Sequence, residues 1–235
     1  MKRPRGILFD FGGTLIEEVG YDPHTGTAAL LATAAHVPPA VTLDVAVARA
    51  RRVSGVVSAR REEFQIEAPW TAVTRLIHDS LGVQFAVPLS ELERTFWDAS
   101  VTMRPMRGAR EALAAIAEAG IPMGVVSNSS FAAATIRHEL AKYGLADHLA
   151  FVMVSADYVV RKPNPLLFEA AAVRLGVAHT DVWFVGDRLD TDVAGAKAAG
   201  LRTVWLRPSG AGPSSAPDAT VADWAELLAL FHSAA

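Results

Sequence analysis

Cysteine is absent from this chain of 235 residues. Its absence excludes disulfide bonds, thiolate metal sites and cysteine nucleophiles, and it is typical of a reducing compartment. Lysine is also scarce, and the only ones are Lys2, Lys142, Lys162 and Lys197. Any chemistry that needs an ammonium group must therefore use one of these four positions.

A strong charge and a long hydrophobic run are also missing. The formal net charge is −3, so no bulk positive field indicates binding to nucleic acid or to an anionic membrane surface. No apolar run approaches the roughly 18 residues that a membrane-spanning helix needs. The basic start of the chain leads directly into an apolar strand pattern, without the features of a signal peptide. We expect a cytoplasmic protein.

The composition that remains is globular, with 51% hydrophobic and 20% charged residues. From residue 104 onward, short apolar strand patterns alternate with helical patterns, which indicates a mostly parallel, Rossmann-like sheet with α/β connections. Strands are expected at 121–126, 151–154, 182–185 and 202–206. Helices are expected at 109–119, 132–143, 164–175, 191–199 and 223–231, with a loop over 209–217.

The region before residue 104 has a different pattern. Helices are expected at 27–36, 42–66, 70–81 and 89–101, punctuated by prolines that start helices but rarely lie inside them. No strand pattern is evident between residues 15 and 103. We therefore expect a core domain formed by residues 1–16 and 104–235, and a helical domain over residues 17–103.

A strand pattern at Ile7-Leu8-Phe9 ends in a carboxylate, Asp10, followed by Gly12, Gly13 and Thr14. Ligands of open α/β sheets lie beyond the carboxyl ends of strands. A carboxylate at that position can attack an electrophile or bind a cation, and glycines let the backbone approach a ligand closely. The alternative is that Asp10 only caps a turn.

Polar side chains also follow the later strands. Ser127 and Asn128 end one strand, just before a helix, where an anion could bind. Lys162, held by the following proline, could offset the charge of a nucleophile and an anionic substrate. Asp187 and Asp192 follow another strand and suit magnesium, with Asp190 as a further candidate. Each signal alone could reflect helix capping or a solvated loop, but a parallel sheet gathers all of them at one edge.

With these motifs in this order, the chain resembles the haloacid dehalogenase-like hydrolases along essentially its whole length. The resemblance implies a helical cap over residues 17–103, and a magnesium-dependent phosphatase in which Asp10 forms an aspartyl-phosphate. It implies that Asp10, the backbone carbonyl of Gly12, Asp187 and Asp192 form the metal site. It also implies that Lys162 assists catalysis and that the transferred group is surrounded by Gly13, Thr14, Ser127, Asn128 and Lys162.

The sequence departs from the phosphatases of this family at Gly12, where they carry a second aspartate that protonates the leaving oxygen. Four interpretations stay open. The protein could be a phosphatase in which His24, Glu17 or Glu18 supplies the proton. It could be a 2-haloacid dehalogenase, since halide leaves without a proton. It could be a phosphonate-cleaving enzyme, although the helical region contains no lysine. It could also be a non-catalytic protein that binds phosphate and metal.

The helical region offers weaker candidates for recognition of a small anionic substrate by a monomer or homodimer. Five arginines could bind a carboxylate or phosphate, although a solvated helix face explains them as well: Arg49, Arg51, Arg52, Arg60 and Arg61. Four aromatic residues could line a pocket or simply pack the helices: Phe64, Trp70, Phe96 and Trp97. The segments 17–20 and 103–108 are expected to act as hinges that let the cap open and close.

Overall fold

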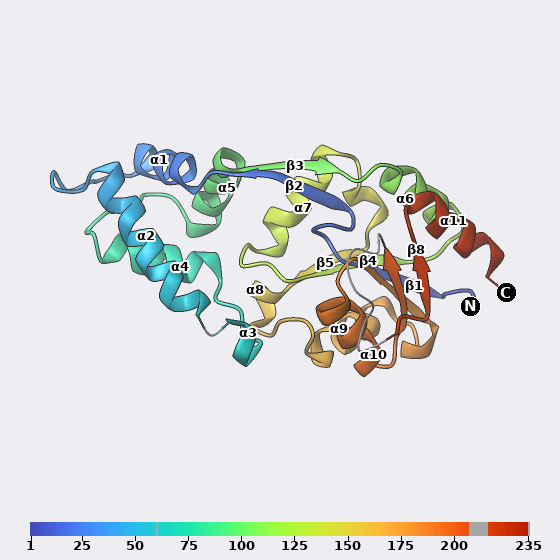
Figure 1. The fold of residues 1–235 in the computed structure, drawn as a ribbon. Helices are drawn as coiled ribbons and strands as arrows, with labels where there is room; N and C mark the ends of the chain where they lie inside the picture. The colour runs from blue at the N-terminus through green and yellow to red at the C-terminus, as the bar shows by residue number, and fades with distance from the viewer. Residues whose placement is uncertain (60, 207–215, 235) are drawn as a thin grey trace.

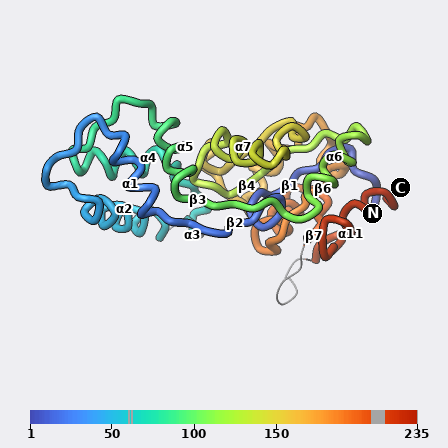
Figure 2. The backbone as a smooth tube through the Cα atoms, turned by 90° about the horizontal axis from the view of Figure 1, so that it is seen from above, coloured from blue at the N-terminus to red at the C-terminus, as the bar shows by residue number. Residues whose placement is uncertain are grey.

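The structure is a computed structural model that describes residues 1–59, 61–206 and 216–234. Figure 1 shows an elongated molecule with an α/β core at one end and a group of helices at the other, joined by the long strands β2 and β3. Figure 2, seen from above, shows the same separation, with both chain termini at the end of the core away from the helical region.

The core is built on a six-stranded sheet in which every neighbouring pair is parallel, in the order β5-β4-β1-β6-β7-β8. This confirms the predicted Rossmann-like α/β fold. The central strand β1 lies between β4 and β6, so the carboxyl ends of these three strands are neighbours. The strands are β1 (Gly6–Phe9), β4 (Met123–Ser127), β5 (Phe151–Val154), β6 (Val182–Gly186), β7 (Arg202–Leu206) and β8 (Ala219–Val221).

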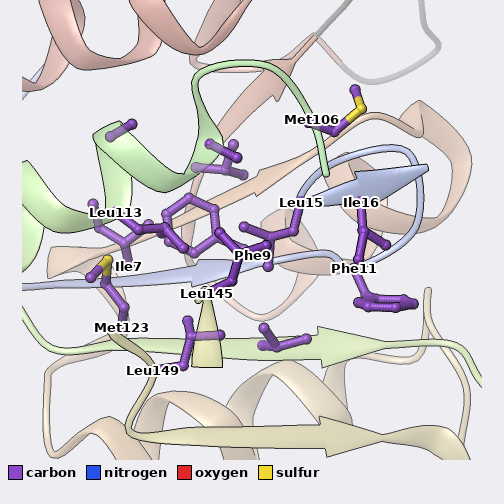
Figure 3. Close-up of a cluster of buried hydrophobic side chains, with 14 of the residues drawn as sticks. Ile7, Phe9, Phe11, Leu15, Ile16, Met106, Leu113, Met123, Leu145 and Leu149 are labelled. Atoms are coloured by element: carbon purple, nitrogen blue, oxygen red, sulfur yellow. The ribbon is translucent and has the colours of Figure 1, made fainter. Parts of the chain in front are cut away.

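Alternate residues of β1 face opposite sides of the sheet, and helices cover both sides. Ile7 and Phe9 pack against α6 (Ala109–Glu118), α7 (Ala133–Lys142) and α11 (Trp224–Ser233), as Figure 3 shows in part. Leu8 packs on the other side against α9 (Pro165–Leu175) and α10 (Ala194–Ala198). Because β1 is buried on both faces, the residue that follows it is held rigidly at the centre of the sheet edge.

Within residues 17–59 and 61–103, the helical region has five helices, named α1 (Pro23–Thr33), α2 (Leu43–Ser58), α3 (Arg61–Phe64), α4 (Trp70–Asp79) and α5 (Leu89–Ser100). Asp22 and Thr42 cap α1 and α2 through their side chains. A side chain at Gly26 would place its Cβ 2.6 Å from the ring of Phe96, so this glycine lets α1 and α5 pack closely. The single helix predicted over 42–66 is wrong, because α2 ends at Ser58 and α3 is a separate turn.

The expectation that no strand lies between residues 15 and 103 is also wrong. β2 (Ile16–Tyr21) and β3 (Val101–Pro105) form an antiparallel pair that connects the core to the helical region. On this pair, Glu17 forms an ion pair with Arg104, 87 residues away in sequence. The pairing depends on a partner from the far end of the helical region, which local sequence patterns do not reveal.

Several smaller elements differ from the predictions. The helix expected at 191–199 begins as a π-helical turn over Leu189–Val193 before α10. The short helix α8 (Ser155–Tyr158) and strand β8 were not predicted. Most of the loop expected at 209–217 lies outside the described residues. The last helix begins close to the expected position, where the Asp223 side chain caps it by accepting a hydrogen bond from the backbone N–H of Glu226.

Candidate active site

The carboxylate of Asp10 lies at the carboxyl end of β1, where it is bound by the ammonium group of Lys162. Lys162 Nζ donates to Asp10 Oδ1 at 2.6 Å, to Asp192 Oδ1 at 2.7 Å and to the carbonyl oxygen of Val126 at 3.0 Å. Asp10 is 6% exposed and Lys162 only 2%. The lysine is therefore fixed between two carboxylates and cannot sample the range of positions of a surface side chain.

Asn128 positions this lysine. Its Oδ1 accepts from the backbone N–H of Lys162 at 2.8 Å, and its Nδ2 donates to the Lys162 carbonyl oxygen at 2.9 Å. The amide thus joins the end of β4 to the loop that precedes α9. The sequence pattern predicted that Asn128 binds the substrate, and the structure gives its side chain this positioning contact.

Three carboxylates converge in front of the sheet. One oxygen each from Asp10, Asp187 and Asp192 lies within 4.8 Å of the other two. Two glycines allow this approach. A Cβ at Gly13, whose φ is +80°, would lie 2.4 Å from Asp187 Oδ2, and a Cβ at Gly186 would lie 2.4 Å from Asp192 Oδ2. Both positions must lack a side chain for the carboxylates to gather.

The electrostatics of this cluster favour a cation. The pKa of Asp10 is raised to about 7, because burial and the carboxylates of Asp192 and Asp187 together outweigh the lowering effect of Lys162. Burial and Asp192 also raise the pKa of Asp187. Burial alone would lower the pKa of Lys162, but Asp10 and Asp192 raise it, so the ammonium stays charged. One ammonium group faces three carboxylates, and the oxygen ligands suit a hard divalent ion such as magnesium.

The cluster opens into a cavity of about 500 Å³, here called the site cavity. Most of the site residues predicted from the sequence line it: Asp10, Gly12, Gly13, Ser127, Asn128, Lys162 and Asp192. Thr14 is fully buried instead, with its hydroxyl 3.5 Å from Asp187 Oδ1. Asp190 points outward and pairs with Arg188, so the acid that joins the cluster from this turn is Asp192.

Two arginines that line the site cavity share one buried carboxylate. Glu67 is 1% exposed and forms ion pairs with Arg161 and with Arg61, whose Nε lies 3.3 Å from Glu67 Oε1. Ser155 Oγ also donates to Glu67 Oε2 at 2.8 Å. The group joins the helical region to the core beside Lys162. Arg61 is one of the arginines that the sequence offered for anion binding. Neither Glu67 nor Arg161 could be predicted in the same way, because the contact between them joins residues 94 positions apart.

Other candidates are not brought to the site cavity. His24 lies exposed at the start of α1, where its backbone N–H donates to Asp22. Arg49 is directed to Ser80, with 2.7 Å between Nη1 and Oγ. Arg52 and Phe64 are exposed, and Arg60 is outside the described residues. Of the aromatic candidates, Trp97 lines the site cavity, where it is 3% exposed.

Comparison with known proteins agrees with this arrangement. Residues 4–200 match the family described as haloacid dehalogenase-like hydrolase. A phosphoserine phosphatase of Thermus thermophilus is 40% identical over 39% of this chain and 38% of its own length, so the match spans well under half of that relative. A phosphoglycolate phosphatase of Pectobacterium atrosepticum is 30% identical over 97% of this chain and 93% of its own length.

Solved structures show the same fold. A haloacid dehalogenase-like phosphatase from Thermococcus onnurineus superposes with a TM-score of 0.67, at 23% identity, covering 100% of this chain and 99% of its own. A 2-haloacid dehalogenase from Pseudomonas syringae superposes with a TM-score of 0.64, at 20% identity, over 99% of both chains. At these identities the superpositions establish the fold alone.

The fold and the family match define a hydrolase with an α/β core and a cluster of carboxylates at the edge of its sheet. The chain belongs to the haloacid dehalogenase-like hydrolase family. In the described residues, no helix has the length and apolar character needed to cross a membrane.

Proposed function

We propose that this protein is a magnesium-dependent phosphatase of a small phosphorylated metabolite. The observation that carries the proposal is the pairing of Lys162 with Asp10 and Asp192 on the wall of the site cavity, with a carboxylate oxygen of Asp187 within 4.8 Å of theirs. A metal-binding acid cluster around a nucleophilic carboxylate suits transfer of a phosphoryl group, which needs charge neutralisation more than covalent assistance. Two relatives that each match 97% of the chain are named as phosphoglycolate phosphatases.

In this proposal Asp10 acts as the nucleophile. One carboxylate oxygen attacks phosphorus, the bond from phosphorus to the leaving oxygen breaks, and an aspartyl-phosphate forms while the leaving oxygen takes up a proton. Water then attacks phosphorus, the bond to Asp10 breaks, and inorganic phosphate leaves. Lys162 holds Asp10 and stabilises the negative charge of the phosphoryl oxygens. Ser127, with its hydroxyl at the end of β4, and the backbone at Gly13 are the further groups proposed to surround the phosphoryl group.

The metal would be held by Asp10 and Asp187, with the backbone carbonyl of Gly12, and Asp192 completes the acidic cluster. When bound, magnesium would neutralise charge on the phosphoryl group so that the anionic nucleophile can approach it. The chain itself supplies the fit, because the two glycines at positions 13 and 186 leave room for the converging carboxylates.

Gly12 has no side chain that could donate a proton to the leaving oxygen. Glu18 is our candidate for that proton donor. Glu17 is held by Arg104 on one face of β2. Glu18 is on the opposite face, next to Met103 of β3. Glu18 and Met103 both line the site cavity. Among the described residues of that cavity, the other carboxylates are Asp10 and Asp192, and both are bound by Lys162. Glu18 would protonate the leaving oxygen and then accept a proton from the attacking water.

A 2-haloacid dehalogenase is the second candidate, favoured by Gly12, because halide leaves without a proton. The acid cluster is the observation against it, since an anionic nucleophile that displaces halide gains nothing from two neighbouring carboxylates, Asp187 and Asp192. A non-catalytic protein that binds phosphate and metal would keep the cluster as well, and only turnover separates it from an enzyme.

The test is release of inorganic phosphate from a panel of phosphorylated metabolites in magnesium, and release of chloride from 2-chloropropionate, with Asp10→Asn as the blank. We expect phosphate release that stops on chelation of magnesium and in the blank. Chloride release that continues after chelation of magnesium would contradict the phosphatase proposal and support the dehalogenase. No release above the blank, together with retained binding of inorganic phosphate, would support the non-catalytic protein.

A further inference from the structure

A second cavity, of about 420 Å³, lies inside the helical region among α1, α2, α4 and α5. We call it the cap cavity. Its volume falls within the range of small-molecule pockets. Its walls include the aliphatic side chains of Leu30, Val47 and Ile77 and the rings of Trp70 and Phe96, all of which are buried. Side chains that pack a small helix bundle normally fill its centre, so an apolar cavity of this size indicates a binding site for a ligand.

The cap cavity adjoins the site cavity. Arg61, Ser130 and Phe131 line both. The ring of Phe131 is stacked against Trp70 and Phe96, with ring centroids 6.0 and 6.2 Å apart. Phe131 follows Ser127 on the loop after β4. A molecule whose phosphate lies beside Ser127 can therefore extend past Phe131 into the helical region.

The lining of the cap cavity restricts the chemistry of its occupant. Among the described residues that line it, none carries a carboxylate, and the two cationic ones are Arg51 and Arg61. An ammonium group placed there would have no counter-charge and would lose its hydration, which is strongly unfavourable. The cap cavity therefore favours binding of an apolar group and disfavours binding of an aminoalkyl group.

One polar atom in the wall lacks a partner. His78 is 4% exposed, and its Nδ1 lies 2.8 Å from the carbonyl oxygen of Thr74. A carbonyl only accepts, so Nδ1 carries the hydrogen and Nε2 is left as an acceptor. Nε2 has no hydrogen-bond partner among the described residues. His78 lines the cap cavity, so a hydroxyl group on an occupant that reaches Nε2 would donate to it and satisfy a buried polar atom.

We propose that the cap cavity binds the leaving group of the substrate, and that this group is an apolar chain or ring without an amino group. The substrate is then a phosphate monoester of a largely apolar alcohol. This inference rests on the proposed phosphatase function and adds the substrate class to it.

The test compares ethyl, hexyl and 2-phenylethyl phosphate, whose leaving alcohols differ little in acidity, and adds 2-aminoethyl phosphate, whose leaving alcohol is more acidic and would by itself leave more readily. Each methylene that leaves water is worth about fourfold in kcat/KM. We expect hexyl and 2-phenylethyl phosphate to exceed ethyl phosphate by at least about tenfold, and 2-aminoethyl phosphate to fall below it. Equal kcat/KM for the four esters would overturn the inference.

A matched pair of variants on α2 locates the effect. Ala50 lines the cap cavity, whereas Ala48 is exposed on the same helix. Ala50→Phe should fill the cavity and remove the advantage of the hexyl and phenylethyl esters over the ethyl ester. Ala48→Phe should preserve that advantage. An unchanged ratio in Ala50→Phe would refute the cap cavity as the binding site, even if the natural protein prefers the longer esters.

Binding without turnover separates this inference from the proposed function. Calorimetric titration of Asp10→Asn with hexyl and ethyl phosphate in magnesium should show at least about tenfold tighter binding of the hexyl ester. If no ester is hydrolysed by the natural protein but this preference is present, the phosphatase proposal fails and the cavity assignment holds. If esters are hydrolysed but neither binding nor kcat/KM depends on chain length, the cavity assignment fails alone.

Discussion

Replacing Glu18 by glutamine should lower the turnover of ethyl phosphate by about 10²- to 10⁴-fold, which is about 3 to 5 kcal/mol of activation free energy. The ethoxide leaving group is strongly basic, so its departure depends on a proton. Glutamine has nearly the same shape but carries no titratable proton. The loss should be much smaller with p-nitrophenyl phosphate, because its leaving oxygen needs little protonation.

A second substitution, Gly12→Asp, should restore the activity that Glu18→Gln loses. A Cβ at Gly12 would meet no atom within 4 Å, and the backbone of Gly12, unlike that of Gly13, is outside the left-handed region. Aspartate should therefore fit at position 12 without strain, on the wall of the site cavity. Gly12→Asp added to Glu18→Gln should restore most of the lost turnover of ethyl phosphate, because a carboxylic acid again faces the leaving oxygen.

Glu17→Gln is the matched control. It removes a neighbouring carboxylate whose ion pair with Arg104 is largely exposed, and such pairs contribute at most about 1 kcal/mol to stability. Its turnover should stay close to that of the natural protein. The assay is steady-state phosphate release with both esters. If Glu18→Gln hydrolyses ethyl phosphate at the natural rate, or loses the same factor with both esters, Glu18 is not the proton donor.

Three further predictions concern the buried charges. Lys162→Met should leave the carboxylates of Asp10 and Asp192 buried without their cation and lower the free energy of unfolding by about 3 to 5 kcal/mol in urea denaturation without metal. Glu67→Gln should lower the free energy of unfolding by a similar amount, because Glu67 is 1% exposed and paired with two arginines. Burial lowers the pKa of His78 below its ordinary value of 6.5, so the unfolded chain binds more protons there below pH 6.5 and stability should fall as the solution is acidified. His78→Gln should reduce this fall between pH 7.5 and pH 5.

Each of these predictions has a control that the structure supplies. Lys2 and Asp181 form an exposed ion pair, so Lys2→Met should change the unfolding free energy by less than about 1 kcal/mol. A loss that small in Lys162→Met or Glu67→Gln would contradict the assigned burial of their charges. His24 is exposed, so His24→Gln should leave the acid-induced loss of stability as it is in the natural protein. A pH dependence that is identical in His78→Gln and the natural protein would refute the role of His78.

The sequence predicted the positions of the central site residues because each belongs to a strand whose neighbours are set by topology. Asp10 and Asp187 directly follow β1 and β6, and Ser127 is the last residue of β4. In a parallel sheet the carboxyl ends of strands share one edge, so a polar residue after each strand must meet the others. The apolar patterns of these strands are strong, which is why the assignment of the sheet and of its site edge followed from local sequence alone.

The sequence was less informative where partners are distant. Glu67 and Arg161 are separated by 94 residues, and neither lies in a motif that reveals the other. The two faces of β2 could not be assigned before its pairing with β3 was known, so Glu17 and Glu18 were equivalent candidates. Only the strand pairing directs Glu17 to Arg104 and Glu18 to the site cavity.

The sequence by itself determined the order along the chain of β1, β4, β5, β6 and β7 and of most of the core helices between them, and the set of side chains that meet at the sheet edge. Tertiary structure alone decided that Asn128 holds the backbone of Lys162 and that an apolar cavity adjoins the site through Phe131. The physical reason is that strand patterns are local and periodic. Hydrogen bonds between loops, and the space left among packed helices, depend on the positions of residues far apart in the chain.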